Sequence, residues 1–535
     1  MNLRVATFSL LCCTMAVTAH ERLSWGDQGN GTYKNPVLNV DYSDPDVIRV
    51  GEKFYMVASD FHFIGMQVLE SSDMVNWRII SQVYNRFDLP GWDKNAHYAG
   101  GSWAPSIRWH DGRFYVYFCT PDEGLFMSTA TDAHGPWEPL HCVKAVPKWE
   151  DPCPLFDDDG QAYLGRSQHG AGPIIVHKMS PDGRTLLDDG VTVYTGPVAE
   201  GTKWLKRGGY YYLIIPEGGV GNGWQTVLRS KHVYGPYEKR VVLEQGSTTI
   251  NGPHQGALVD TPPSFSPDGD EQAWWFYHFQ ATPALGRVVH LQPARWKDDW
   301  PLIGIDIDGN GIGEPVSVWE TPSGGGREAF LPQTSDDFNS DSLGLQWQWC
   351  HNPDDDFWSL TERRGWLSIS AQPSPDLKNA RNMLTQKVMG YQGEATTLVD
   401  CHAVTRGTFA GLLCMGREYR GIGVCGDGIY LEHNGQREVV CKKKKKLAKV
   451  WLRVSLNVMA SSTNTGSRTE DSGKTGLQCC DSHQFYYSLD GRHFTPVGTP
   501  FEMHEGNWKG IRVGLYCYGD RGKALFDSFN YDILK

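Results

Sequence analysis

A unit of about 50 residues recurs five times between positions 44 and 277 of this chain. Each copy joins a polar residue, a short apolar run, a turn and an aromatic-rich strand. The copies begin at Asp44-Pro45, Trp103-Ala104-Pro105, Asp151-Pro152, Glu200-Gly201 and His254-Gln255. One such unit cannot bury both faces of its own sheet, so the units pack around a central channel. The repeat predicts a five-bladed β-propeller.

A propeller brings equivalent positions of its blades to the same channel, so we expect Asp44, Asp151 and Glu200 to face one another. Like charges in a partly dry site raise each other's pKa, which is costly unless the cluster is used. A single Asp-Pro dipeptide is usually a turn. Three acids in repeated units instead indicate acid/base chemistry.

At these residues the chain resembles glycoside hydrolase family 43, five-bladed propellers that hydrolyse pentose linkages in plant polysaccharides. The resemblance is carried by Tyr42–Arg49, Trp103–Ile107, Asp151–Gly160, Ala199–Lys203 and Asn251–Gln255. Together these segments are a specific signature. The resemblance implies that Asp44 is the general base and Glu200 the general acid. It also implies that Asp151 raises the pKa of Glu200 and orients it.

The resemblance further implies that His254 is the active-site histidine and that Arg287 binds the sugar. Trp103, next to Ala104 in the second repeat, either fills the blade core or stacks on a sugar face. Glu150 departs from the family pattern, in which an apolar residue is more common before the aspartate.

His62 and Phe63, in the loop after the first aromatic strand, are candidates for the rim of the pocket, with a position elsewhere equally compatible.

Glycoside hydrolysis needs a proton on the departing oxygen and an electron-rich group opposite it. The resemblance implies inversion of configuration, which requires the base and the acid to lie roughly 6.5–9.5 Å apart. This chemistry requires no cofactor. In relatives the histidine equivalent to His254 lies near a calcium ion, so water-mediated metal binding at His254 is an expectation, whereas nothing in the sequence has zinc-ligand spacing.

A second β domain follows a segment of linker composition. Residues 450–458 alternate between apolar and polar, and Asp490-Gly491 is typical of a hairpin turn. This part resembles the concanavalin-A-like sandwich (jelly-roll) of β-xylosidase members of the family, in which a loop walls off one side of the pocket. Asp337 and Asp527 are candidates for a structural calcium site, although exposed aspartates are more often simply solvated.

The predicted organisation is a signal peptide over residues 1–19, a propeller over 30–320, a Gly-rich linker over 321–330 and the sandwich over 331–535. The N-terminal segment has a positive start, an apolar stretch and a small-residue cleavage site, although two early cysteines leave a lipoprotein signal as the competing interpretation. We therefore expect export to a bacterial periplasm or the medium. No later apolar run is long enough to span a bilayer.

The formal net charge of −12 argues against nucleic acid and against polyanionic substrates. A neutral plant polysaccharide or oligosaccharide suits it better. The sequence thus predicts an inverting exo-glycosidase that releases terminal α-L-arabinofuranosyl or β-D-xylosyl residues from hemicellulose. Two alternatives are a non-catalytic carbohydrate-binding propeller and a structural or protein-binding propeller; the latter has no need of all three acids.

Overall fold

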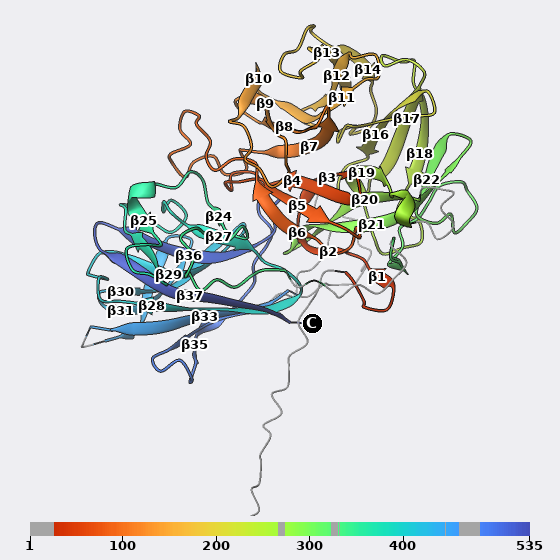
Figure 1. The fold of residues 1–535 in the computed structure, drawn as a ribbon. Helices are drawn as coiled ribbons and strands as arrows, with labels where there is room; N and C mark the ends of the chain where they lie inside the picture. The colour runs from red at the N-terminus through yellow and green to blue at the C-terminus, as the bar shows by residue number, and fades with distance from the viewer. Residues whose placement is uncertain are drawn as a thin grey trace, which may run out of the picture.

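The computed structural model describes residues 26–265, 273–322, 330, 332–443, 446–458 and 482–534. Within these ranges the chain is all-β apart from two short 3-10 helices, η1 (Pro263–Phe265) and η2 (Asp355–Phe357). The predicted signal segment 1–19 and most of the predicted linker lie outside the described residues. Figure 1 shows two bodies side by side, a propeller followed by a sandwich.

Five antiparallel sheets surround the centre of the propeller, which confirms the predicted blades. The first blade contains β3 (Ser43–Val50), β4 (Lys53–Ser59), β5 (Gln67–Ser71) and β6 (Arg78–Gln82). The second contains β7 (Trp103–His110), β8 (Arg113–Thr120), β9 (Gly124–Ala130) and β10 (His141–Ala145). The third contains β11 (Trp149–Phe156), β12 (Ala162–Gln168), β13 (Ile174–Met179) and β14 (Val191–Tyr194). The fourth contains β15 (Lys203–Arg207), β16 (Tyr210–Glu217), β17 (Trp224–Ser230) and β18 (Glu238–Leu243).

The fifth blade joins the beginning of the propeller to its end. It contains β19 (His254–Asp260), β20 (Trp274–Thr282), β21 (Gly286–Lys297), β22 (Trp300–Ile303) and the early strand β2 (Leu38–Asp41). Strand β2 pairs with β21, so that Leu38 lies opposite Val289. Nearby, β1 (Thr32–Lys34) pairs with β23 (Val318–Glu320). Hydrogen bonds between distant parts of the chain thereby close the ring.

The innermost strand of each blade is entered through a residue with left-handed backbone geometry. The φ angles are 54° at Asp44, 41° at Ala104, 54° at Asp151, 65° at Gly201 and 30° at Gln255. In four of the blades the strand register also shifts at this point. A bulge of this kind re-aims side chains and is common beside active sites. The repeated unit therefore encodes a left-handed residue at the blade entry as well as a sheet.

This geometry corrects one sequence-based expectation, because Glu200 does not occupy the position equivalent to Asp44 and Asp151. That position in the fourth blade belongs to Gly201. Glu200 occupies the position one residue earlier, as do Trp103, Glu150 and His254 in their blades. Either of the two positions can carry an acidic residue, as Glu150 and Asp151 show in the third blade, so the motifs alone did not reveal this offset.

Two seven-stranded sheets form the C-terminal sandwich. One contains β24 (Gln348–Trp349), β27 (Leu384–Lys387), β36 (Arg512–Gly519), β29 (Thr408–Met415), β30 (Tyr419–Cys425), β31 (Gly428–His433) and β32 (Gln436–Lys442). The other contains β25 (Trp358–Ser359), β26 (Leu367–Ser370), β37 (Lys523–Leu534), β28 (Gln392–Asp400), β33 (Lys449–Asn457), β34 (His483–Ser488) and β35 (Thr495–Phe501). Strand β33 alternates between buried and half-buried residues, as predicted.

The sandwich packs against the first blade and the loop that follows it (Figure 1). At this interface the ammonium of Lys387 lies 2.9 Å from the carboxylate of Asp60 and donates a 2.8 Å hydrogen bond to the carbonyl of Asp41. Both charged side chains are almost fully buried, and the buried guanidinium of Arg512 lies 3.7 Å from the same carboxylate of Asp60. The two domains are thus held in one arrangement at the side of the pocket.

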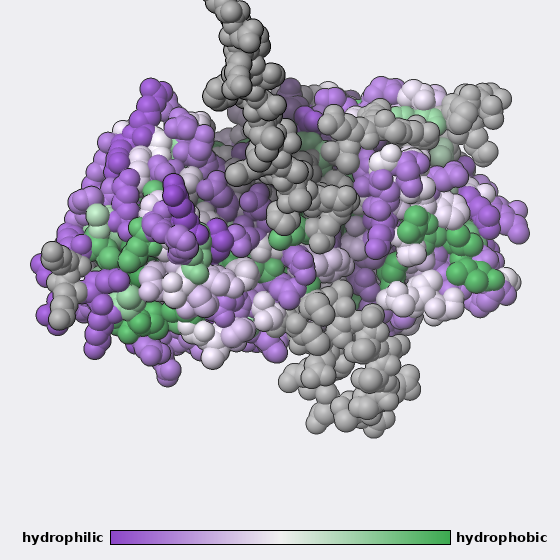
Figure 2. All heavy atoms as spheres, turned by 90° about the horizontal axis from the view of Figure 1, so that it is seen from below, coloured by the Kyte–Doolittle hydropathy of each residue, from purple (hydrophilic) through white to green (hydrophobic). Residues whose placement is uncertain are grey.

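On the face shown in Figure 2, hydrophilic residues predominate and hydrophobic residues form small, separate patches. No helix within the described ranges is long and apolar enough to span a membrane.

Candidate active site

A cavity of about 430 Å³ opens where the innermost strands begin. The predicted residues in its wall are Asp44, Trp103, Ala104, Asp151, Glu200, His254 and Arg287. Each comes from a blade entry or, for Arg287, from the start of β21. The structure therefore brings together all seven residues proposed for catalysis and sugar binding.

Asp44 is held as part of a polar cluster at the base of this cavity. Its Oδ1 lies 2.7 Å from Nη1 of Arg287, and its Oδ2 accepts a 2.6 Å hydrogen bond from the hydroxyl of Ser59. The backbone N–H of Ala104 in turn donates to that hydroxyl at 2.6 Å. Both oxygens of the Asp44 carboxyl group, which lines the cavity, are thus fixed by these partners.

Asp151 is more deeply buried and accepts hydrogen bonds from three directions. The Ser167 hydroxyl and the backbone N–H of Gly201, at 2.8 Å, both donate to Oδ2. The side-chain amide of Gln255 donates to Oδ1 at 3.1 Å. These contacts tie the third, fourth and fifth blades together through one carboxyl group. Asp151 is therefore a fixed group next to Glu200.

Glu200 faces the cavity with its side chain about one-fifth exposed. Its Oε1 lies 3.0 Å from Nε2 of His254, which is buried on the neighbouring blade. A neutral imidazole can donate to this oxygen through Nε2 and so orient the carboxyl group. Glu200 also lies close to Glu150 and Asp151: one carboxylate oxygen from each of the three residues lies within 4.8 Å of the other two.

The three clustered carboxyls differ in proton affinity. Burial and the charges of Asp151, Glu200 and Asp44 raise the pKa of Glu150 to about 8. Burial and the charge of Glu200 also raise the pKa of Asp151, although hydrogen bonds from Ser167 and Gly201 lower it in part.

The pKa of Glu200 lies below its ordinary value, contrary to the expectation from the sequence. Burial raises this pKa, but the hydrogen bond and charge of His254, together with Arg287, outweigh burial. The repulsion between the clustered carboxyls is therefore relieved first by protons on Glu150 and Asp151. Sequence reasoning missed this because it placed no donor on Glu200 and treated Glu150 only as an irregularity.

An aromatic wall lines the side of the cavity towards the sandwich. Trp103 and Trp508 meet edge to face with ring centroids 5.5 Å apart, and Trp508 stacks at 6.5 Å on Phe61. The indole N–H of Trp103 donates to the carbonyl of Ala99 at 2.6 Å, so the ring is fixed. Trp103 is half-buried in this wall and does not fill the core of its blade.

Trp508 belongs to the sandwich, in the segment between β35 and β36. The propeller approaches this segment closely, because a Cβ on Gly286 would lie 2.3 Å from the backbone nitrogen of Gly510. The hydroxyl of Ser43 also donates to the carbonyl of Trp508 at 3.2 Å. The second domain thus completes the pocket, as expected, but the sequence did not identify the residue because the contact spans more than 460 positions.

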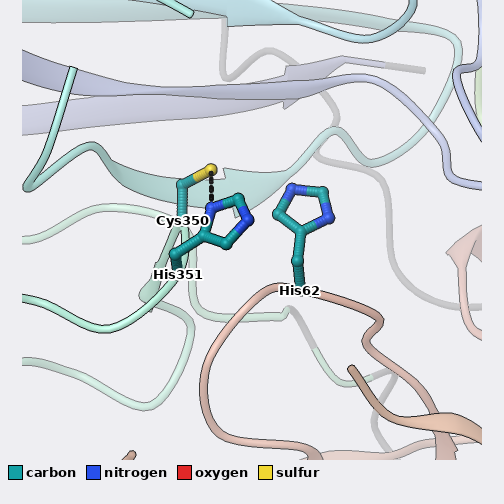
Figure 3. Close-up of side chains that lie close together, drawn as sticks. All are labelled: His62, Cys350 and His351. Carbon is teal, nitrogen blue, oxygen red and sulfur yellow. Dashed lines mark hydrogen bonds between the residues drawn. The ribbon is translucent and has the colours of Figure 1, made fainter. Parts of the chain in front are cut away.

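His62 and Phe63 do not line the cavity. They are buried between the domains, where His62 faces Cys350 and His351 (Figure 3). The backbone N–H of Ala99 donates to Nδ1 of His62 at 3.3 Å, so the proton of a neutral ring lies on Nε2. That nitrogen has no lone pair for a metal, and burial together with the charge of Lys509 keeps the pKa of His62 well below its ordinary value. The cluster is an interdomain packing contact.

The predicted calcium ligands have a donor set that does not fit the six to eight oxygens that calcium prefers. Asp337 is exposed, and its carboxylate accepts hydrogen bonds from the backbone and side-chain amides of Asn339 at 3.1 and 2.7 Å. Asp527 lies on β37, and neither aspartate joins a group of three ligating side chains among the described residues. At His254 the nearest carboxylate is the catalytic candidate Glu200. Metal binding at His254 remains a prediction.

Sequence profiles match both parts of the chain. "Glycosyl hydrolases family 43" matches residues 33–301, and "Beta xylosidase C-terminal Concanavalin A-like domain" matches residues 335–532. The chain is 62% identical over 502 residues to a protein of Xylanibacter ruminicola named "Putative beta-xylosidase", covering 94% of this chain and 89% of that one. It is 30% identical over 542 residues to "Non-reducing end alpha-L-arabinofuranosidase BoGH43B" of Bacteroides ovatus, covering 94% and 95%.

The fold is also similar to solved structures. The GH43 protein BlXynB from Bacillus licheniformis superposes with a TM-score of 0.77 at 26% sequence identity, covering 94% of this chain and 99% of that one. The similarity extends over propeller and sandwich together.

Proposed function

Because this chain belongs to the glycosyl hydrolases of family 43, we propose that it is an inverting exo-glycosidase that releases terminal pentosyl residues from hemicellulose. The observation that carries the proposal is the convergence of Asp44, Asp151 and Glu200 on one cavity beside Arg287 and His254. A propeller that only bound carbohydrate would not need buried carboxyls of opposed proton affinity.

Asp44 acts as the general base. Its contacts with Arg287 and Ser59 hold its carboxyl group in one orientation, from which it takes a proton from an attacking water. Inversion requires this water to enter between the base and the acid and to attack opposite the departing oxygen.

Glu200 acts as the general acid that protonates the departing oxygen. Burial and the charge of Glu200 raise the pKa of its neighbour Asp151, so this pair retains a proton more readily than an isolated carboxyl group does. Interacting carboxyls titrate as a group, so a proton held by Asp151 is available to Glu200 at short range. Asp151 fixes the geometry of this cluster through Gly201 and Gln255. The reaction uses carboxyl groups and water alone.

Trp508 supports the assignment of exo action. It brings the sandwich to the edge of the cavity, where its ring meets that of Trp103 edge to face. Aromatic rings such as Trp103 and Trp508 suit the apolar faces of a sugar. A pocket walled in this way favours a chain end over an internal linkage.

The substrate we propose first is a terminal β-D-xylosyl residue, because the relative at 62% identity carries the name of a β-xylosidase. A terminal α-L-arabinofuranosyl residue is the second candidate, because the relative at 30% identity is named an arabinofuranosidase. Side-by-side assays with 4-nitrophenyl β-D-xyloside and 4-nitrophenyl α-L-arabinofuranoside decide between them. Hydrolysis of neither, together with calorimetric binding of xylo-oligosaccharides, would identify a non-catalytic carbohydrate-binding propeller.

The stereochemical proposal has a separate test. A proton NMR time course should show the inverted anomer of the released sugar first. Early appearance of the retained anomer would contradict the single-displacement mechanism.

We also propose that the protein is exported, on the strength of the sequence of residues 1–19. Expression in a bacterium followed by N-terminal sequencing should find a mature start near His20. An intact Met1 in the cytoplasmic fraction would contradict export.

A further inference from the structure

The wall of the cavity beside Glu200 contains two polar side chains that the proposed reaction does not use, Glu150 and His169. Glu150 precedes Asp151 at the entry of the third blade. His169 lies in the turn between β12 and β13 of the same blade. Both line the cavity, and neither was assigned a role from the sequence.

Glu150 holds the β12–β13 turn in place. Its Oε1 lies 2.8 Å from Nδ1 of His169, and the backbone N–H of Ala171 donates a hydrogen bond to the same carboxyl group. The side chain of Glu150 is 13% exposed, whereas that of His169 is 44% exposed. The glutamate is thus the buried support and the histidine the accessible group.

His169 continues the aromatic wall. Its ring lies 5.5 Å from that of Trp103 at an interplanar angle of 31°. Because Nδ1 is occupied by Glu150, Nε2 is left as the polar end of the ring. A side chain with one fixed nitrogen and one free nitrogen is suited to hydrogen-bond a ligand hydroxyl in one orientation.

The location of this pair relative to Glu200 indicates which part of a substrate it meets. A carboxylate oxygen of Glu150 lies within 4.8 Å of a carboxylate oxygen of Glu200, which is on the adjacent blade. The general acid contacts the departing oxygen, so groups next to it face the sugar that leaves with that oxygen. Arg287 on the fifth blade and Asp44 on the first lie on the other side of Glu200 in the blade order.

We propose that His169 recognises a hydroxyl of the leaving-group sugar and that Glu150 is the positioning residue that orients it. The inference rests on the proposed function, because a leaving-group side exists only if Glu200 is the acid. It adds a determinant of substrate choice that acts on the leaving group and not on the terminal sugar.

The test compares two substrates that share the same terminal sugar. The leaving group of xylobiose is a sugar with several hydroxyls. The leaving group of 4-nitrophenyl β-D-xyloside is an aryl group without sugar hydroxyls. His169→Ala should lower kcat/KM for xylobiose about tenfold, the usual effect of losing one hydrogen bond, and leave the value for the aryl xyloside within about twofold. If arabinofuranosides are the better substrates, an arabinofuranosyl-xylobiose and the aryl arabinofuranoside replace the pair.

Two further variants separate positioning from simple structural damage. Glu150→Ala should reproduce the selective loss on xylobiose, and the double variant should be no worse than either single one, because both remove one interaction. His169→Gln, which retains a hydrogen-bonding end, should recover part of the loss. His134→Ala, an exposed histidine of the second blade that is ion-paired with Asp132, is the matched control and should change neither substrate.

Equal losses of His169→Ala on both substrates, or no loss on xylobiose, would overturn the proposal. Additive losses of the two single variants would overturn the positioning role of Glu150. If the unmodified protein hydrolyses neither substrate, the proposed function itself fails, which is a different result from either of these.

Discussion

Asp44 and Arg287 form an ion pair of 2.7 Å that joins the first blade to the fifth across the point where the ring closes. The base of the proposed reaction is therefore built by the two ends of the propeller. The pairing of β2 with β21 lies directly beside both residues, with Asp41 opposite Val288.

Asp44→Asn should lower kcat by at least about 10³-fold on xylosides and arabinofuranosides alike, because no other group is placed to activate water. The measurement is kcat on both aryl glycosides, with circular dichroism as the check on folding. Ser59→Ala removes only one hydrogen bond to the same carboxylate and should cost about tenfold. A near-normal rate for Asp44→Asn on either sugar would disprove its role.

Glu200→Gln should lose far more rate on substrates whose leaving group needs a proton. A 2,4-dinitrophenyl glycoside departs without assistance, so its rate should fall about tenfold or less, whereas xylobiose should lose about 10³-fold. Steady-state kinetics on both substrates provide the comparison. The same loss on both would assign Glu200 to substrate binding and not to proton transfer.

Glu150→Gln should make stability less dependent on pH. The pKa of Glu150 is about 8 in the folded protein against an ordinary value of 4.5, so the folded state binds the proton more tightly. Stability therefore falls as pH rises from about 4.5 to 8, since the unfolded chain releases this proton first. Thermal melts at pH 5 and pH 8.5 should show the variant gaining about 2 °C on the wild type at the higher pH. If the melting temperatures of the variant and the wild type differ by the same amount at both pH values, the raised pKa of Glu150 is contradicted.

Trp508→Ala should raise KM on xylobiose about tenfold and lower kcat less, because the ring shapes the pocket without contacting the reacting atoms. Trp319→Ala is the control, since Trp319 is similarly exposed but lies on β23 away from the cavity. An unchanged KM in Trp508→Ala would mean that the sandwich serves stability alone.

Gly201→Ala should destabilise the protein by about 1–3 kcal/mol and also impair turnover. Its φ of 65° disfavours a side chain, and the added Cβ would lie 2.5 Å from Cδ of Pro216. The same residue donates its N–H to Asp151. Gly209→Ala is a matched control with φ of 77° and nothing within 4 Å of the added atom, so it tests the backbone cost alone. Equal effects of both substitutions on turnover would show that the contact of Gly201 with Asp151 does not contribute to catalysis.

The sequence was sufficient for the blades and for most of the pocket because both depend on local repetition. Each blade entry places its motif at the start of an innermost strand, so the motifs alone brought Asp44, Asp151 and His254 to one cavity. The alternating pattern of residues 450–458 identified β33 for the same reason.

Long-range contacts were beyond the sequence. Trp508 reaches the pocket through a close approach of two glycines from different domains, and no local pattern records such a contact. The proton affinity of Glu200 depends on a neighbour 54 positions away, His254, whose distance and orientation only the fold determines. His62 lay in a suitable loop, but the sandwich covers that loop and removes it from the pocket.

The pairing of β2 with β21 has a consequence for how a nascent chain acquires its shape. The two strands lie about 250 residues apart in sequence, and contacts of such separation form late because the intervening chain must first be ordered. Until residue 297 has been synthesised, β2 has no complete partner strand and the fifth sheet lacks its edge strand. Strand β2 must therefore wait for a strand made about 250 residues later, and a chain cut short before β21 leaves β2 free to pair with another molecule.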